Sequence, residues 1–228
     1  ASTLNDLSDV LQENLSIWIG HDPSSRTDNA ERNLGVGIQA LDAITTGDDN
    51  VAVGYDALTT NTTGSYNTAS GASSLKLNVN GTDNTAFGYA SLKKTGGGST
   101  VGGDYNTGLG SNCFQNNQGG DYNVAIGYNA GDSCTNGDRN VLIGSNTDTS
   151  SATVNNEILI GYDVQGRGGN RAVIGNNDVF AVYAARDGQG VLYANGSINT
   201  SDRRLKENIE DTPLGVDFIN EVKTESYK

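Results

Sequence analysis

The side chains that most often carry catalysis or bind metals are few and scattered in this sequence. His21 is the only histidine, and Cys113 and Cys134 are the only cysteines. A single imidazole without a partner cluster predicts a surface residue. No C-x-x-C or similar metal spacing occurs, so two isolated thiols are the simpler interpretation and a disulfide between neighbouring repeats is the alternative. We therefore predict no cofactor and no metal site.

Carboxylates are abundant, with 27 Asp and Glu residues against 14 Lys and Arg and a net charge of −13. Cleavage of a glycan needs two carboxylates placed across a groove, and no pair stands out. The acidic balance disfavours nucleic acid and anionic membrane surfaces as partners. The sequence shows no signal peptide and no apolar run near eighteen residues, so no membrane insertion is expected.

Four tyrosines share one sequence position, immediately after a glycine: Tyr55, Tyr89, Tyr128 and Tyr162. This spacing predicts an exposed aromatic stripe. Tyrosine offers an apolar ring face and a polar hydroxyl, which suits stacking on sugar rings at a binding site. The alternative is that the four rings cap a seam between associated chains.

These tyrosines belong to a repeat with a period of 17 residues. A glycine closes each unit, and the intervals between closing glycines are 17 except for one of 22 and a last one of 14: Gly20, Gly37, Gly54, Gly71, Gly88, Gly110, Gly127, Gly144, Gly161 and Gly175. The long interval contains the glycine-rich run 95–103, which we interpret as a loop bulging from one coil. A fixed period of this length predicts a stacked solenoid.

The signature Asn-x-small-x-Gly predicts a short strand in each coil. Apolar residues flank a small one, as in Val124-Ala125-Ile126. Alternation with period two predicts that Val124 and Ile126 are buried, and that the small residue between them allows another chain to approach. A second apolar column, Leu41, Leu58, Leu75, Leu92 and Phe114, is expected to form a second strand facing the first.

A column of asparagines and a column of glycines complete the predicted coil. Asn residues precede each strand and are expected to stack, each amide bonding to the next coil: Asn33, Asn50, Asn67, Asn84, Asn106, Asn123 and Asn140. Glycines seven residues before each closing glycine are expected at a turn with positive φ: Gly47, Gly64, Gly81, Gly103, Gly120 and Gly137. So thin an interior buries little apolar surface, and the free energy gained by that burial barely offsets the conformational entropy lost when each coil becomes ordered. Association of several chains would bury more apolar surface and is therefore expected.

Two segments carry a resemblance to known families. Units such as Asn123-Val-Ala-Ile-Gly127 resemble the β-roll heads of trimeric autotransporter adhesins and similar repeats in phage tail fibres. The segment 200–209, Thr-Ser-Asp-Arg-Arg-Leu-Lys-Glu-Asn-Ile, resembles the opening of the self-cleaving, endosialidase-type intramolecular chaperone domain of phage tailspikes and tail fibres. The resemblance implies a homotrimer, and it implies that Ser201 and Lys206 form a nucleophile and base dyad for self-cleavage.

The expected fold is therefore an all-β, homotrimeric β-roll or β-solenoid with a 17-residue repeat, an intertwined β stem and a short C-terminal helical segment. The expected organisation is a linker over 1–15, the β-roll shaft over 16–175, the stem over 176–200 and the truncated beginning of the chaperone domain over 201–228.

The expected function is the receptor-binding distal part of a phage tail fibre on the virion, matured by self-cleavage and without substrate-directed activity. Its partners would be two identical chains, a glycan or protein receptor on the bacterial surface and other tail proteins at the N-terminus. The alternatives are a bacterial trimeric adhesin head and a glycan-depolymerising tailspike.

Overall fold

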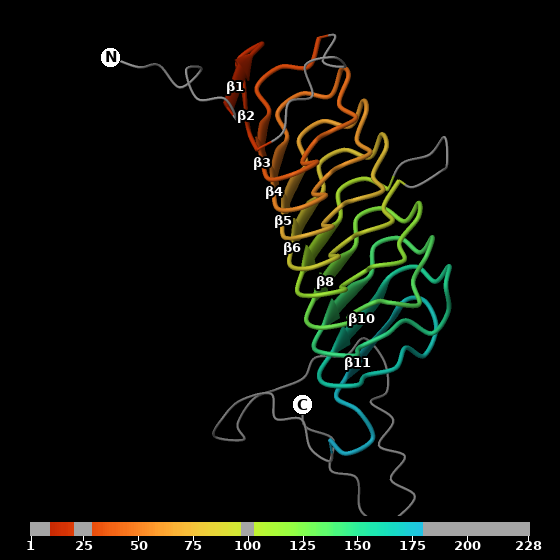
Figure 1. Ribbon diagram of the computed structural model, residues 1–228. Helices are drawn as coiled ribbons and strands as arrows, with labels where there is room; N and C mark the ends of the chain where they lie inside the picture. Colours follow the sequence, from red (N-terminus) through yellow and green to blue (C-terminus); the bar gives the residue numbers. More distant parts are fainter. Residues whose placement is uncertain (1–9, 21–28, 97–102, 180–228) are drawn as a thin grey trace, which may run out of the picture. The chain divides into compact units, whose positions relative to one another are not determined.

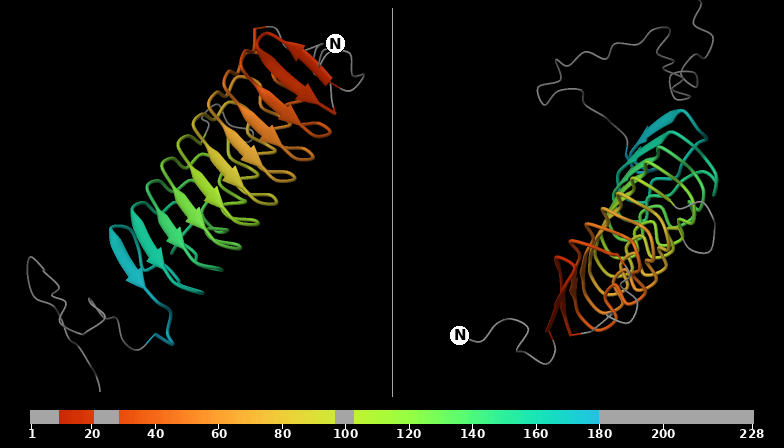
Figure 2. Two further views of the ribbon diagram at one scale, coloured as in Figure 1. Left: turned by 90° about the vertical axis from the view of Figure 1, so that its left-hand side faces the viewer. Right: turned by 90° about the horizontal axis from the view of Figure 1, so that it is seen from above.

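The computed structural model describes residues 10–20, 29–96 and 103–179, which form an all-β parallel solenoid (Figure 1). Each coil of the chain contributes one short strand, and successive strands lie side by side in a single sheet (Figure 2). In the described part of the chain, no helix is long and apolar enough to cross a membrane.

The strands follow one another in the sheet in the order of the sequence. They are β1 (Val10–Glu13), β2 (Ser16–Ile19), β3 (Leu34–Val36), β4 (Val51–Val53), β5 (Thr68–Ser70), β6 (Thr85–Phe87), β7 (Thr107–Leu109), β8 (Val124–Ile126), β9 (Val141–Ile143), β10 (Glu157–Ile160) and β11 (Arg171–Ile174). β1 pairs with β2 in antiparallel fashion, and each later pair is parallel. The expected linker over 1–15 therefore contains a strand, which turns into β2 through Asn14 and Leu15 at φ of 47° and 62°.

The strands keep a constant register from coil to coil. Ala52 pairs with Ala69, and Ala86 pairs with Gly108 across the longer interval. The pairing therefore resumes unchanged on the far side of residues 97–102, which lie outside the described part. β-branched residues are frequent in these strands, and they fit a pleated surface well.

The two faces of the strands are the reverse of what the sequence pattern suggested. The small central residue points inward and is fully buried, as at Ala52, Ala69, Ala86 and Ala125. The flanking residues lie on the outer face, where Val53 is 38% and Ile126 37% exposed. Alternation fixes which residues share a face but not which face is inside. The narrow interior admits only a small side chain at most of these positions, so the larger ones remain outside.

The second apolar column is buried as expected, but it does not form a second strand. Leu58, Leu75 and Phe114 are fully buried opposite the sheet. Their backbones have positive φ of 52°, 47° and 44° and belong to turns rather than strands. The turns that carry these residues are still hydrogen-bonded from coil to coil, since Leu58 N–H donates to the Ser74 carbonyl at 3.1 Å. Burial and these bonds offset the steric cost of left-handed leucine, roughly 1–2 kcal/mol per residue.

The stacked asparagines form the ladder that the sequence predicted. The Oδ1 atom of Asn50 accepts from the backbone N–H and the Nδ2 of Asn67 at 3.0 and 3.1 Å. The Nδ2 of Asn50 donates to Asn33 Oδ1 at 3.0 Å and to the Gly64 carbonyl at 2.9 Å. The same bonds continue along the column through Asn84, Asn106, Asn123 and Asn140. Each of these buried amides is thus fully bonded, as burial of polar groups requires.

A buried carboxylate ends the ladder, which the sequence pattern did not reveal. Glu157 occupies the next Asn position, and its backbone N–H donates to Asn140 Oδ1 at 2.9 Å. Its side chain is fully buried and accepts from the N–H groups of Ser150 and Gly168 at 3.0 and 2.6 Å. The Gly168 donor lies in the next coil, between β10 and β11, so the side chain still bonds to that coil, through a backbone N–H in place of an asparagine.

The glycines seven residues before each closing glycine have a different role from the one expected. Gly64 and Gly81 are buried, yet neither has positive φ. An added Cβ at Gly64 would overlap the Gly81 carbonyl oxygen of the next coil. Close contact between stacked coils, not turn geometry, therefore requires glycine here. Positive φ instead occurs at the closing glycines, for example 135° at Gly54 and 133° at Gly127.

Several sequence predictions fall outside the described residues. These are His21, the dyad Ser201 and Lys206, the stem beyond residue 179 and the C-terminal helical segment.

Candidate functional site

The four tyrosines that follow closing glycines form a regular exposed column. Tyr55, Tyr89, Tyr128 and Tyr162 are 55%, 57%, 53% and 66% exposed. They stand on alternate coils, because the equivalent residues of the coils between them are Ala72, Ser111 and Ser145. Large aromatic side chains therefore alternate with small ones along this edge.

The backbone of the tyrosine column is fixed by bonds between coils. The carbonyl of Tyr55 accepts from Ser73 N–H at 2.8 Å, and that of Tyr89 accepts from Asn112 N–H at 2.8 Å. The following Asn146 donates to the Tyr128 carbonyl at 2.9 Å. Each ring thus projects from a rigid scaffold at a spacing set by the stacking of the coils, which is the arrangement that a precise binding site needs.

A charged pair accompanies the first two tyrosines of the column. Lys76 Nζ lies 2.6 Å from Oδ2 of Asp56, whose side chain is 5% exposed. The hydrogen bond to Asp56 raises the pKa of Lys76, and Tyr55 and Tyr89 contribute in the same direction. Lys76 therefore stays protonated and presents N–H donors on the coil between those of Tyr55 and Tyr89.

A second set of tyrosines, Tyr66, Tyr105 and Tyr122, precedes the ladder asparagines and so lies at the opposite end of the strands. Tyr105 and Tyr122 stack with their ring centroids 4.8 Å apart and their planes 4° apart. The negative charge of Asp83, with a further contribution from Tyr122, raises the pKa of Tyr105. In the sequence, the only sign of this stack is that Tyr105 and Tyr122 each stand immediately before a ladder asparagine. We interpret this ring stack as a contact that supports the stacking of the coils, because the two rings pack against each other.

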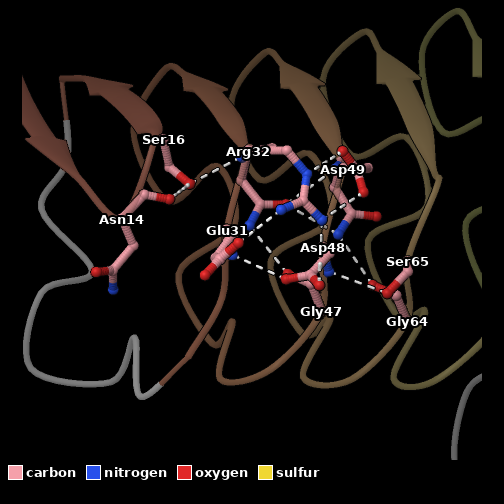
Figure 3. Close-up of polar contacts among 11 residues, drawn as sticks. Asn14, Ser16, Glu31, Arg32, Gly47, Asp48, Asp49, Gly64 and Ser65 are labelled. Atoms are coloured by element: carbon pink, nitrogen blue, oxygen red, sulfur yellow. Dashed lines mark hydrogen bonds and ion pairs between the residues drawn. The ribbon is translucent and has the colours of Figure 1, made fainter.

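An ion-pair network joins the first coils of the shaft (Figure 3). Arg32 Nε and Nη2 donate to the two carboxylate oxygens of Asp49 at 2.8 and 2.9 Å. The hydrogen bond raises the pKa of Arg32 and lowers that of Asp49. Asp48 Oδ1 accepts from Glu31 N–H at 2.8 Å. These acidic side chains are thus occupied by protein donors, and no cluster of three or more potential metal ligands occurs among the described residues.

The two cysteines are separate, buried thiols, as the simpler interpretation held. Cys113 Sγ lies 3.1 Å from Ser91 Oγ and 3.1 Å from the Gly110 carbonyl. Cys134 occupies a different interior column, beside the Gly137 carbonyl. Burial raises the pKa of both thiols, that of Cys134 to about 11.

Both thiols are expected to resist alkylation in the native protein. A pH of 8 is below the raised pKa of each thiol, so little thiolate forms. Burial also keeps the reagent from reaching the sulfur atoms. Mass spectrometry after iodoacetamide treatment should show no label on the folded chain and two labels after denaturation in urea. Rapid labelling of the native chain at pH 8 would contradict the buried placement.

Comparison with protein-family models, curated proteins and solved structures finds no match for this chain.

Proposed function

We propose that this chain is the receptor-binding distal part of a homotrimeric phage tail fibre that attaches to the bacterial surface. The observation that carries the proposal is an apolar stripe on the outer face of the sheet, interrupted on β5 by Ser70. One side chain on each of six strands is 37–45% exposed there: Val53, Phe87, Leu109, Ile126, Ile143 and Ile160. A long exposed apolar stripe marks an interaction surface.

The stripe suits identical chains lying alongside one another. Apart from Ser70 it repeats with the coil, so a second copy in the same orientation offers the same spacing of apolar side chains. Each stripe residue is still partly covered by its own chain, and association would bury the rest. The apolar contribution is about 25 cal/mol per Å², added to a solenoid whose own interior is thin. The three-fold symmetry is taken from the resemblance of the repeats and of segment 200–209 to fibre proteins.

The remaining parts of the proposal follow from the same resemblance. Residues 201–228 would begin a chaperone that assembles the trimer and is then removed by the dyad Ser201 and Lys206, with Lys206 taking the proton of the attacking hydroxyl. The shaft itself would act by display, without activity on a substrate. Its partners would be two identical chains, tail proteins at the N-terminus and a glycan or protein on the bacterial surface.

The association is tested by the mass of the purified chain in sedimentation equilibrium or mass photometry, where three chains are expected. A folded monomer at micromolar concentration would contradict the proposal. Attachment is tested by adsorption of the labelled chain to a panel of bacterial species, with at least one species expected to retain it. Adsorption to none of them would contradict the receptor-binding role.

Self-cleavage is tested in a chain extended by a complete chaperone domain. A cut beside Ser201 is expected, and Ser201→Ala and Lys206→Ala should each abolish it while leaving the trimer assembled. Intact-mass analysis measures the cleavage. If the two alanine variants are cut as completely as the parent chain, the dyad assignment is wrong.

A further inference from the structure

We propose that the tyrosine column Tyr55, Tyr89, Tyr128 and Tyr162 is a binding track for an extended β-1,4-linked glycan that runs along the solenoid axis. The inference rests on the proposed function, because it names the class of surface molecule that the shaft would contact.

The tyrosines of the column recur at a regular interval along the solenoid axis. Hydrogen-bonded strands lie about 4.8 Å apart, so tyrosines on alternate coils recur about every 9.6 Å. The strand register is constant from β4 to β10, so this interval is the same at each step of the column. The small side chains of Ala72, Ser111 and Ser145 leave space between successive rings.

An extended β-1,4-linked chain has a matching period. Each sugar is flipped relative to the one before it, so the same ring face recurs at every second sugar. One sugar is comparable in length to the rise of one coil, about 4.8 Å. A chain laid along the column would therefore present an equivalent C–H-rich face to every tyrosine. Helical α-linked chains lose this phase after one contact.

The chemistry of the edge fits a neutral sugar polymer. The tyrosine rings are more than half exposed, so their faces are open to stack, and their hydroxyls can bond to sugar oxygens. Lys76 adds N–H donors on the coil between those of the first two tyrosines, and its ion pair with Asp56 at 2.6 Å fixes its position. The coil-to-coil backbone bonds hold the backbone of the column in place before the ligand arrives, which lowers the entropic cost of binding.

The track predicts a stepwise dependence of affinity on chain length. Titration calorimetry with β-1,4-linked N-acetylglucosamine oligomers, and with β-1,4-linked glucose oligomers as a second arm, should show affinity rising at three sugars and again at five. Three sugars reach a second tyrosine and five reach a third. Each added ring is expected to contribute about tenfold in affinity. α-1,4-linked glucose oligomers of equal length should bind at least tenfold more weakly.

Substitutions separate stacking from other effects. Tyr89→Ala should weaken binding of the five-sugar oligomer by about tenfold or more, whereas Tyr89→Phe should retain most of the affinity. Tyr66→Ala is the matched control, because Tyr66 is equally exposed at 60% but stands at the opposite end of the strands. Ser111→Leu should weaken binding by filling the gap between Tyr89 and Tyr128.

The outcomes distinguish this inference from the proposed function. Affinity without a length step, equal binding of α-linked oligomers, or equal losses in the Tyr66 and Tyr89 variants would overturn the glycan track. A Tyr89→Ala chain that no longer forms trimers would overturn it too, because the ring would then cap a seam between chains. If the parent chain adsorbs to bacteria and the Tyr89→Ala chain adsorbs equally, the track is wrong and the fibre function stands. Tyrosine-dependent oligomer binding without adsorption to any bacterium would support the track and contradict the fibre function.

Discussion

Asn123→Ala is expected to lower the free energy of unfolding by about 3–5 kcal/mol, more than a typical surface substitution. Asn123 Oδ1 accepts from the N–H and the Nδ2 of Asn140 at 2.9 and 3.1 Å. Its Nδ2 donates to the Gly137 carbonyl at 2.8 Å. The substitution leaves the buried Asn140 N–H and Gly137 carbonyl without these partners, at about 1–3 kcal/mol each, and adds a small cavity.

The matched control is Asn136→Ala, in the following coil, which also carries Asn140. Asn136 is exposed, and its Nδ2 donates only to the neighbouring Thr135 Oγ1 at 3.3 Å. Urea denaturation followed by circular dichroism should show a loss within about 0.5 kcal/mol for this variant. If Asn123→Ala lost no more stability than Asn136→Ala, the ladder would contribute little and the stacking of the coils would depend on other contacts.

The periodic columns were predictable from the sequence. A ladder residue must recur at the spacing of the coils, so Asn50, Asn67 and Asn84 revealed both the period and the contact. The buried column Leu58, Leu75 and Leu92 was found in the same way. Repetition makes position along the coil readable without knowing the fold in detail.

The direction of the side chains could not be read from the same pattern. Val124-Ala125-Ile126 fits a strand with either face inward, and the preference for burying large apolar residues pointed to the wrong one. The interior of the coil decides the matter: an added Cβ at Gly108 would lie 2.6 Å from Ser91 Oγ and 3.1 Å from Leu92 Cγ, whereas Leu142 and Leu159 are fully buried at the same position of later coils. The room at this position therefore differs from coil to coil. That volume is a property of the closed coil and not of any one segment.

Backbone conformation was equally hidden. Glycine at Gly64 suited either positive φ or close packing of coils, and only the stacked geometry shows the second. An interior column of Asn61, Asn78 and Asn117 also went unnoticed, although its residues recur at the repeat spacing and bond to the Gly64, Gly81 and Gly120 carbonyls.

The candidate site was predictable in position but not in composition. The shared place of Tyr55, Tyr89, Tyr128 and Tyr162 after a glycine indicated an exposed column. The pairing of Lys76 with Asp56 joins residues 20 apart in sequence, and it depends on how one coil's turn lies over the coil before. The dyad Ser201 and Lys206 stays a prediction from the resemblance.

Two adjacent substitutions should separate folding from association. Ala125→Asp is expected to unfold the shaft around β8, because it places an unpaired carboxylate in a fully buried position, at a cost of several kcal/mol. Ile126→Asp adds the same charge one residue on, at a position that is 37% exposed on the outer face. Its carboxylate can remain in water, so the coil should keep its fold.

The Ile126→Asp chain should nevertheless fail to assemble, because the proposed trimer would bury this stripe and the charge would have to be desolvated there without a partner. Circular dichroism should show a folded, parent-like β spectrum for Ile126→Asp and loss of that spectrum for Ala125→Asp. Mass photometry at the same concentration should show monomers for Ile126→Asp and trimers for the parent chain. If Ile126→Asp unfolds while Ala125→Asp does not, the faces are assigned the wrong way round. If Ile126→Asp folds and still assembles, the apolar stripe is not the surface that joins the chains, and another face of the solenoid must do so.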